Sequence, residues 1–321
     1  GNDALEYPRR RIRMAWKKLG LIFDLTKHNI PWLKSHAMVP TPLVIHDRIR
    51  VYFSGRDANG VSRISFVDVQ RDDPSRIIYI HDRPILSVGK LGTCDDSGSI
   101  ATCAVRAGHQ VYLYYTAYNR RVTVPYSNSI GLAVSNDEGR SFERMYDGPI
   151  LDRNCTEPYF VISPWVLCED GRWHMWYASA TGWLLVEGRP ESLYHIKYAT
   201  SEDGVLWHRD NVSCILPLAP EEANARPTVV KEADGYRMWF CYRGSHEFRD
   251  GPDSYRIGFA EANTPEEWTR CDAKAGISCG TNEWDSRMQA YPAVIDVDGN
   301  RYMFYNGNGF GVQGFGCAIW E

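Results

Sequence analysis

Apolar and aromatic residues recur along the chain as pairs of short segments joined by turns. Each pair has an apolar segment, a turn with Asp-Gly or a similar pair, and a segment of alternating large aromatic side chains. Five such pairs occupy residues 42–55, 103–116, 164–178, 227–242 and 292–306. Their first residues lie 61 to 65 positions apart. This spacing predicts an internal repeat of β-hairpins.

A third strand is expected after each hairpin, at residues 62–69, 129–135, 195–201, 256–262 and 314–321. A fourth, with an aromatic residue followed by a basic one, is expected at residues 141–151, 206–216 and 267–277. The last repeat ends after its third strand. Residues 15–25 have the same order of aromatic, basic and apolar residues, so we expect them to supply the missing strand.

These repeats predict an all-β fold: a five-bladed β-propeller with four-stranded antiparallel blades, whose ring is closed by the N-terminal strand. Radial repetition leaves only short sheet edges exposed. We expect one domain over residues 1–321, with residues 1–14 as an N-terminal extension. A β-sandwich is the main alternative, but it would not explain five similar units or complementary chain ends.

Composition restricts the classes of partner. The net charge of −4 gives no electrostatic reason to expect binding to nucleic acid or to an anionic membrane. No apolar run approaches the roughly 20 residues that span a bilayer. Nine cysteines without a C-x-x-C pair, several inside apolar strands, favour a reducing compartment. We therefore expect a cytoplasmic protein without a metal site or cofactor, whose ligand is a small molecule or an oligosaccharide.

Carboxylates recur at one position of the repeat. The residues seven positions before each hairpin start are Ser35, Asp96, Glu157, Pro220 and Asp285. In a propeller these loops meet at one mouth of the central channel, where clustered carboxylates would repel one another and raise at least one pKa. Acidic residues before strands also serve as turn formers and solvated loop charges, so this structural interpretation stays open.

Other side chains are expected on the same face. The candidate substrate-binding residues are His36, Arg56, Asp95, Trp183, His195, Arg226, Arg243, Tyr291 and Asn306. Arginines bind carboxylate or phosphate, and a tryptophan can stack on a sugar ring, which suggests an anionic or phosphorylated sugar. Each residue also has an ordinary structural interpretation, in a surface ion pair or in packing between blades.

Two turns, SNDEGRSF at residues 135–142 and SEDGVLW at residues 201–207, resemble the Asp-box of sialidases, and we assign them a structural role. With five blades and acidic residues at the mouth, the chain resembles the five-bladed propeller glycosidases: arabinofuranosidases, xylosidases, invertases, levansucrases and mannoside phosphorylases. Segments such as EPYFVISPWVL, ARPTVV and YNGNGFG look like those of proteins associated with bacterial surface-polysaccharide gene clusters.

The resemblance implies catalysis by carboxylates on the inner strands, but the usual positions here hold no acid. If the acids have moved outward, Glu157 is the general acid, because the following proline aims its side chain. Asp96, or Asp95 in its place, would be the base or nucleophile, and Asp285 would tune pKa values or bind substrate. The main hypothesis is a glycoside hydrolase-like enzyme, or a phosphorylase or transferase variant, acting on a surface-polysaccharide sugar. The alternative is a non-catalytic glycan-binding or scaffold propeller.

Overall fold

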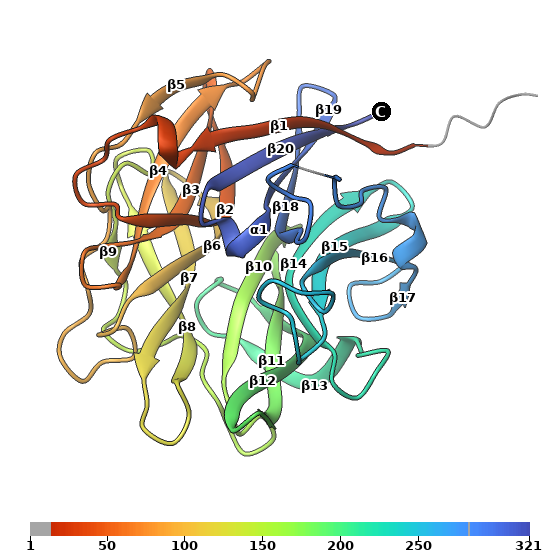
Figure 1. The fold of residues 1–321 in the computed structure, drawn as a ribbon. Helices are drawn as coiled ribbons and strands as arrows, with labels where there is room; N and C mark the ends of the chain where they lie inside the picture. Colours follow the sequence, from red (N-terminus) through yellow and green to blue (C-terminus); the bar gives the residue numbers. More distant parts are fainter. Residues whose placement is uncertain (1–13, 282) are drawn as a thin grey trace, which may run out of the picture.

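The computed structural model describes residues 14–281 and 283–321 and shows five four-stranded antiparallel sheets arranged as a ring (Figure 1). The predicted five-bladed β-propeller is confirmed. In each blade the first strand faces the central channel and the fourth lies at the outer edge.

The blades are numbered here in chain order. Blades 1 and 2 contain β2 (Ser35–Ile45), β3 (Arg48–Arg56), β4 (Ser62–Gln70) and β5 (Ile77–Ile80), then β6 (Ser99–Ala107), β7 (Gln110–Arg120), β8 (Tyr126–Ser135) and β9 (Glu143–Arg144). Blades 3 and 4 contain β10 (Val161–Glu169), β11 (Arg172–Val186), β12 (Arg189–Ser201) and β13 (His208–Ile215), then β14 (Ala223–Glu232), β15 (Gly235–Arg243), β16 (Arg256–Ala262) and β17 (Trp268–Arg270). Blade 5 contains β18 (Ala290–Val297), β19 (Asn300–Asn306), β20 (Gly314–Trp320) and β1 (Trp16–Asp24). The short helical turns are η1 (Leu25–Lys27), η2 (Asp272–Lys274) and α1 (Asn308–Gly311).

Asp-Gly pairs make the tight turns between first and second strands. Asp170 and Gly171 both have positive φ, 50° and 79°, and so do Asp298 and Gly299, 51° and 82°. Two successive positive φ values define the type I′ turn, whose twist matches that of a hairpin. The predicted hairpins are therefore present, with the expected turn chemistry.

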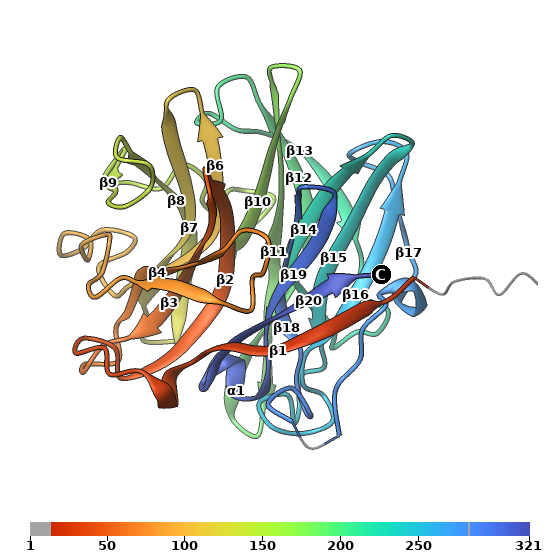
Figure 2. The same ribbon diagram turned by 90° about the horizontal axis from the view of Figure 1, so that it is seen from above.

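The ring closes through the N-terminal strand, as predicted. β1 pairs antiparallel with β20 from Trp16↔Trp320 to Asp24↔Gly314, and the two strands lie side by side in both views (Figures 1 and 2). Asn306 supports the closure from the channel side, because its amide accepts from Val39 N and donates to Ala37 O, both at 2.8 Å. Apart from Met14, the predicted extension at residues 1–14 lies outside the described residues.

Every inner strand has a bulge at the same position of the repeat, and these bulges correct the alignment of the repeats that was made from the sequence. In blade 3, Ser163 and Pro164 together face Tyr177. In blades 1 and 2 the residues equivalent to Pro164 at this bulge are Pro40 and Thr102. The alignment from the sequence used Pro42 and Cys103 instead. Counted from the bulge positions, Asp95 and not Asp96 is the equivalent of Glu157. The slip arises because register depends on the bulge, which sequence similarity alone does not locate.

The Asp-box-like turns have the structural role expected of them. Asp137 accepts hydrogen bonds from the backbone N–H groups of Arg140 and Ser141, at 3.1 and 3.0 Å. The carbonyl of Gly139 in the same turn accepts a hydrogen bond from Tyr52 of blade 1 at 2.8 Å. The turn thus fixes its own backbone and also ties two neighbouring blades together. None of the helical turns in the described ranges is long and apolar enough to cross a membrane.

Candidate functional site

Three blades contain the same buried set of an acid, a tyrosine and a base. The acid precedes the inner strand, the tyrosine follows it by 20 residues on the second strand, and the base comes from the fourth strand. We call each set a blade ion pair. The three sets are Asp95, Tyr115 and Arg144; Glu157, Tyr177 and Arg209; and Asp285, Tyr305 and Lys18.

Glu157 shows the geometry of a blade ion pair. Its side chain is 2% exposed, and both carboxylate oxygens accept from the Tyr177 hydroxyl, at 2.9 and 3.1 Å. Arg209 donates at 3.1 Å, and the ammonium of Lys197 lies 3.8 Å away. Burial raises the pKa of Tyr177, which keeps its hydroxyl protonated as a donor. The carboxylate of Glu157 is therefore directed into its own blade.

The other predicted carboxylates are also held locally. Asp285 accepts from Tyr305 at 3.0 Å and from Gln289 at 2.8 Å, and pairs with Lys18 at 2.7 Å. Asp96 lies in the loop before β6, where hydrogen bonds from the Ser97 hydroxyl and the Gly92 N–H, at 2.8 and 3.0 Å, hold its pKa below the usual value.

Asp96, Glu157 and Asp285 thus each have hydrogen-bond or ion-pair partners inside their own blade. The expectation that they repel one another at the channel mouth stays a prediction. The catalytic roles assigned to these three residues stay predictions.

A pocket of about 310 Å³ lies at the end of the channel where the inner strands begin. All five blades contribute to it, and seven of its thirteen lining residues are aromatic. We call it the mouth pocket. Its lining residues are Met38, Tyr118, Pro125, Tyr126, Pro190, Glu191, Tyr194, Arg243, Phe248, Arg249, Tyr255, Tyr291 and Phe310.

Two of the predicted substrate-binding residues, Arg243 and Tyr291, line the mouth pocket. Arg243 is the last residue of β15, and Tyr291 is the bulge residue of β18, where a φ of 56° turns its side chain out of the strand alternation. The hydroxyls of Tyr194 and Tyr255 are hydrogen-bonded to each other. Burial raises the pKa of Tyr255 well above its usual value, so the phenol is neutral at physiological pH.

Among the described residues that line the mouth pocket, Glu191 is the one with a carboxylate. Arg249 binds both of its oxygens, at 2.7 and 3.0 Å. Such a bidentate pair fixes the plane of the carboxylate and cancels its charge.

The other predicted residues lie outside the lining of the pocket. Trp183 packs edge to face on Tyr126, at 5.2 Å between ring centroids, and so supports the pocket wall from behind. Arg56 is exposed at the end of β3. His36 bonds to Ser35 in blade 1, and His195 bonds to Ser213 in blade 3, at 2.8 and 3.1 Å.

We expect His36 and His195 to stay neutral until strongly acidic pH. Burial, with the nearby charges of Arg56 and Lys197 respectively, lowers the pKa of each imidazole from 6.5 to about 4. The unfolded chain therefore takes up protons first, and stability falls as the pH drops from about 6.5 to about 4. Proton NMR titration of the imidazole C–H signals of the two residues checks this. Midpoints near 6.5 for His36 and His195 would contradict the expectation.

Arg226 lies in the channel, at the bulge of β14 that corresponds to the Tyr291 bulge of β18. Its side chain is fully buried, and its Nη2 donates to Pro40 O and Thr41 Oγ1 across the channel, at 3.2 and 3.3 Å. Nε and Nη1 have no hydrogen-bond partner among the described residues. Burial lowers the pKa of Arg226 to about 10, so the guanidinium is still cationic at neutral pH. The guanidinium links blades 4 and 1 and blocks the channel below the mouth pocket.

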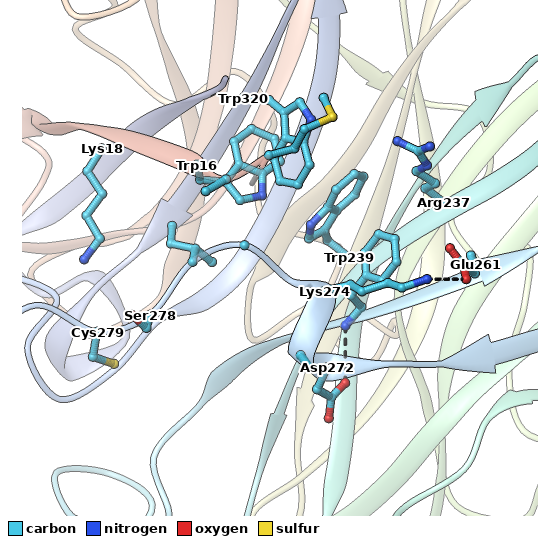
Figure 3. A pocket seen from close by; sticks show the side chains of 16 residues that line it. Trp16, Lys18, Arg237, Trp239, Glu261, Asp272, Lys274, Ser278, Cys279 and Trp320 are labelled. Atoms are coloured by element: carbon cyan, nitrogen blue, oxygen red, sulfur yellow. Dashed lines mark hydrogen bonds and ion pairs between the residues drawn. The ribbon is translucent and has the colours of Figure 1, made fainter. Parts of the chain in front are cut away.

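A larger groove, of about 880 Å³, lies on the outer edge between blades 4 and 5 (Figure 3). The indoles of Trp16, Trp239 and Trp320 lie together in this groove, with ring centroids 5.0 to 5.9 Å apart in edge-to-face contacts. Lys18 lies apart from them (Figure 3). Trp16 and Trp239 are almost wholly buried, and of the three indoles Trp320 alone keeps part of its surface open to a ligand. The mouth pocket is therefore the better candidate site.

Most residues of the mouth pocket are missing from the sequence-based candidates. Tyr194 and Tyr255 each precede, by two residues, an isoleucine of the third strand, and this shared position could have indicated them. Phe248 and Arg249 come from the loop between β15 and β16, which has no counterpart in the repeat pattern. No cluster of residues suited to hold a metal ion occurs in the described part of the chain.

Similarity to known proteins agrees with this fold. The uncharacterized protein Rv1502 of Mycobacterium tuberculosis (strain ATCC 25618 / H37Rv) is 40% identical over 310 residues, covering 96% of this chain and 100% of that protein. The chain belongs to the Rv1502 family. A second member, the uncharacterized protein MT1551 of strain CDC 1551 / Oshkosh, has the same identity and coverage. No family model matches the chain.

Solved structures similar to this member of the Rv1502 family are glycosidase-type propellers. A glycoside hydrolase has a TM-score of 0.70 at 16% identity, covering 94% of this chain and 90% of its own. A thermostable family-43 glycoside hydrolase has a TM-score of 0.67 at 17% identity, covering 90% of this chain and 89% of its own. A structure reported with the GH130 family of mannoside phosphorylases has a TM-score of 0.64 at 14% identity, covering 95% of this chain and 93% of its own. The expected resemblance to five-bladed glycosidases is thus confirmed for the fold.

Proposed function

We propose that the protein is a carbohydrate-active propeller that binds a sugar in the mouth pocket. The observation that carries this proposal is the lining of the pocket, to which all five blades contribute and in which blades 2 to 5 supply seven aromatic side chains. Sugar rings have apolar C–H faces that pack on aromatic rings, and the hydroxyls of tyrosine both donate to and accept from sugar hydroxyls.

The size of the pocket agrees with a small ligand. Its volume of about 310 Å³ is at the lower end of the range of about 300 to 1,000 Å³ typical of small-molecule sites. The Arg226 side chain blocks the channel below, so a longer glycan would enter with one terminal unit and extend outward. The glycosidase-like fold supports the choice of a carbohydrate as the ligand class.

Binding of the sugar can be tested with Tyr118→Ala. Tyr118 is a half-buried wall residue of the mouth pocket, so we expect its loss to weaken binding by about 10-fold with little change in stability. Isothermal titration calorimetry against a panel of monosaccharides and short oligosaccharides measures the affinity. Tyr146→Ala, at an exposed tyrosine outside the pocket in blade 2, is the control and should leave affinity unchanged. Equal loss in both variants would contradict the site.

Hydrolysis of a glycosidic bond is the second candidate function, and Glu191 favours it by placing a carboxylate in the mouth pocket. Glycosidases generally use two carboxyl groups, one that protonates the leaving oxygen and one that acts as base or nucleophile, and Glu191, as the ionised partner of Arg249, suits the second role. If aryl glycosides are turned over, Glu191→Gln should abolish turnover while the protein stays folded. Glu157→Gln provides the comparison, because the general acid predicted from the sequence lies inside blade 3. Loss of turnover only in Glu157→Gln, with an unchanged melting temperature, would instead support the sequence-based assignment.

A further inference from the structure

One cation in the mouth pocket has no anionic partner. Arg243 is 3% exposed, and its guanidinium donates to two backbone carbonyls, Ser192 O at 2.8 Å and Gly244 O at 2.9 Å. No ion pair joins it to an acidic side chain of the described residues. A buried cation usually has a counter-charge, because removing it from water costs several kcal/mol.

The other charges of the pocket cancel. Glu191 and Arg249 form a bidentate pair, which is neutral as a unit. The mouth pocket therefore has a net charge of about +1, which comes from Arg243. Burial acts to lower the pKa of Arg243, but the oxygens of Tyr194 and Tyr255 more than offset it, and the pKa lies above its usual value. Arg243 is thus cationic at neutral pH.

Aromatic rings surround the Arg243 guanidinium. Its Cζ lies 4.0 Å from the centroid of Phe248, 5.2 Å from Tyr194 and 5.9 Å from Tyr255. Rings at these distances stabilise the cation and exclude water from it. Nη1 and Nη2 each bond one carbonyl and keep a second N–H group, and the planar guanidinium is the group whose donors match two oxygens of a carboxylate or phosphate.

We propose that the mouth pocket selects sugars that carry an anionic group, a carboxylate or a phosphate, and that Arg243 binds this group. The inference rests on the proposed sugar binding and defines its ligand class. The anion supplies the counter-charge that the protein does not, while the tyrosines contact the sugar ring.

Calorimetry with charged and neutral versions of the same sugar tests the proposal. The probes are D-glucuronate, D-galacturonate, D-glucose 6-phosphate and D-mannose 6-phosphate, each beside its neutral hexose. We expect at least one anionic probe to bind more tightly than its neutral parent by about 10-fold or more. The uronates and the phosphates distinguish a carboxylate from a phosphate ligand.

Arg243→Met should weaken binding of the anionic probe by about 10- to 100-fold and remove the preference for the anionic probe over its neutral hexose. Arg120→Met, at an exposed arginine at the end of β7 outside the pocket, is the control with unchanged affinity. If Arg243→Met does not fold, Arg243→Lys keeps the charge without the fork, and we expect a loss of about 10-fold.

The outcomes separate the two proposals. Neutral hexoses that bind as tightly as the anionic probes, or unchanged affinity in Arg243→Met, would overturn the anion site and leave sugar binding in place. Inorganic phosphate that binds through Arg243 while no sugar binds would support the anion site and overturn the sugar-binding function. Absence of binding by every probe and by phosphate would overturn both.

Discussion

Replacing Arg144 by methionine is expected to lower the free energy of unfolding by about 3 kcal/mol, the largest effect of any single substitution considered for this protein. Arg144 is the base of the blade ion pair in blade 2. Its Nε donates to Asp95 at 2.6 Å, and Nη2 donates to Ser87 O at 2.6 Å.

The expected loss is large because Asp95 cannot reach solvent. Its side chain is 0% exposed, so without Arg144 its charge has only hydrogen bonds from Tyr115 at 3.0 Å and Thr93 at 3.2 Å. Removing one partner of a buried pair leaves the other charge uncompensated, which costs about 3 to 5 kcal/mol. Methionine keeps most of the side-chain volume, so lost packing should contribute little.

Urea unfolding followed by tryptophan fluorescence measures the difference. Lys90→Met is the matched control, since Lys90 pairs with Asp147 at 2.6 Å with side chains 75% and 58% exposed. Exposed pairs of this kind contribute at most about 1 kcal/mol. Similar losses in Arg144→Met and Lys90→Met would show that the blade ion pair has no special role in stability.

Replacing Arg226 by methionine is expected to raise the free energy of unfolding by about 2 kcal/mol. Most substitutions of buried residues destabilise a protein, so this prediction has the opposite sign from the usual result. The reason is the unsatisfied guanidinium in the channel, whose Nε and Nη1 have no partner within the described ranges.

Methionine would keep the contact with Trp165, whose ring centroid lies 5.2 Å from the Arg226 Cζ. It would lose two long hydrogen bonds, at 3.2 and 3.3 Å, and the attraction between cation and ring. These losses are smaller than the cost of burying a charge with unpaired donors, about 1 to 3 kcal/mol or more for each unsatisfied group.

Arg226→Lys is the comparison, because lysine keeps the charge without reaching both acceptors and should be less stable than the methionine variant. Thermal and urea unfolding measure all three proteins. If the methionine variant is less stable than the parent by more than about 1 kcal/mol, groups other than the side chains and backbone of the protein must stabilise the guanidinium in the channel.

The fold could be predicted from the sequence because each repeat unit contains the same order of strands. The aromatic residue followed by a base in the fourth strand even indicates the blade ion pairs: Arg144, Arg209 and Lys18 all occupy that position. The same pattern located the N-terminal strand in blade 5. Alternation and turn chemistry are local properties, so they are visible in a single sequence.

The site was less predictable, for three physical reasons. The bulges shift the register by one or two residues, so the pattern selects Asp96 where the structure places Asp95. In addition, a recurring acid has the same appearance in a sequence whether it faces the channel or a tyrosine of its own blade, as Glu157 faces Tyr177. The mouth pocket also depends on loops of unequal length, and these lie outside the repeat.

The pairing of β1 with β20 has a consequence for how the protein is made. Lys17 and Glu321, bonded across this pairing, are 304 residues apart in the chain. On the ribosome, blades 1 to 4 contain only consecutive strands and can form as they emerge, whereas blade 5 must wait for β20. β1 is thus translated before blades 1 to 4 but can be placed only after them, and its unpaired edge stays available to chaperones or to other nascent chains until β20 has emerged.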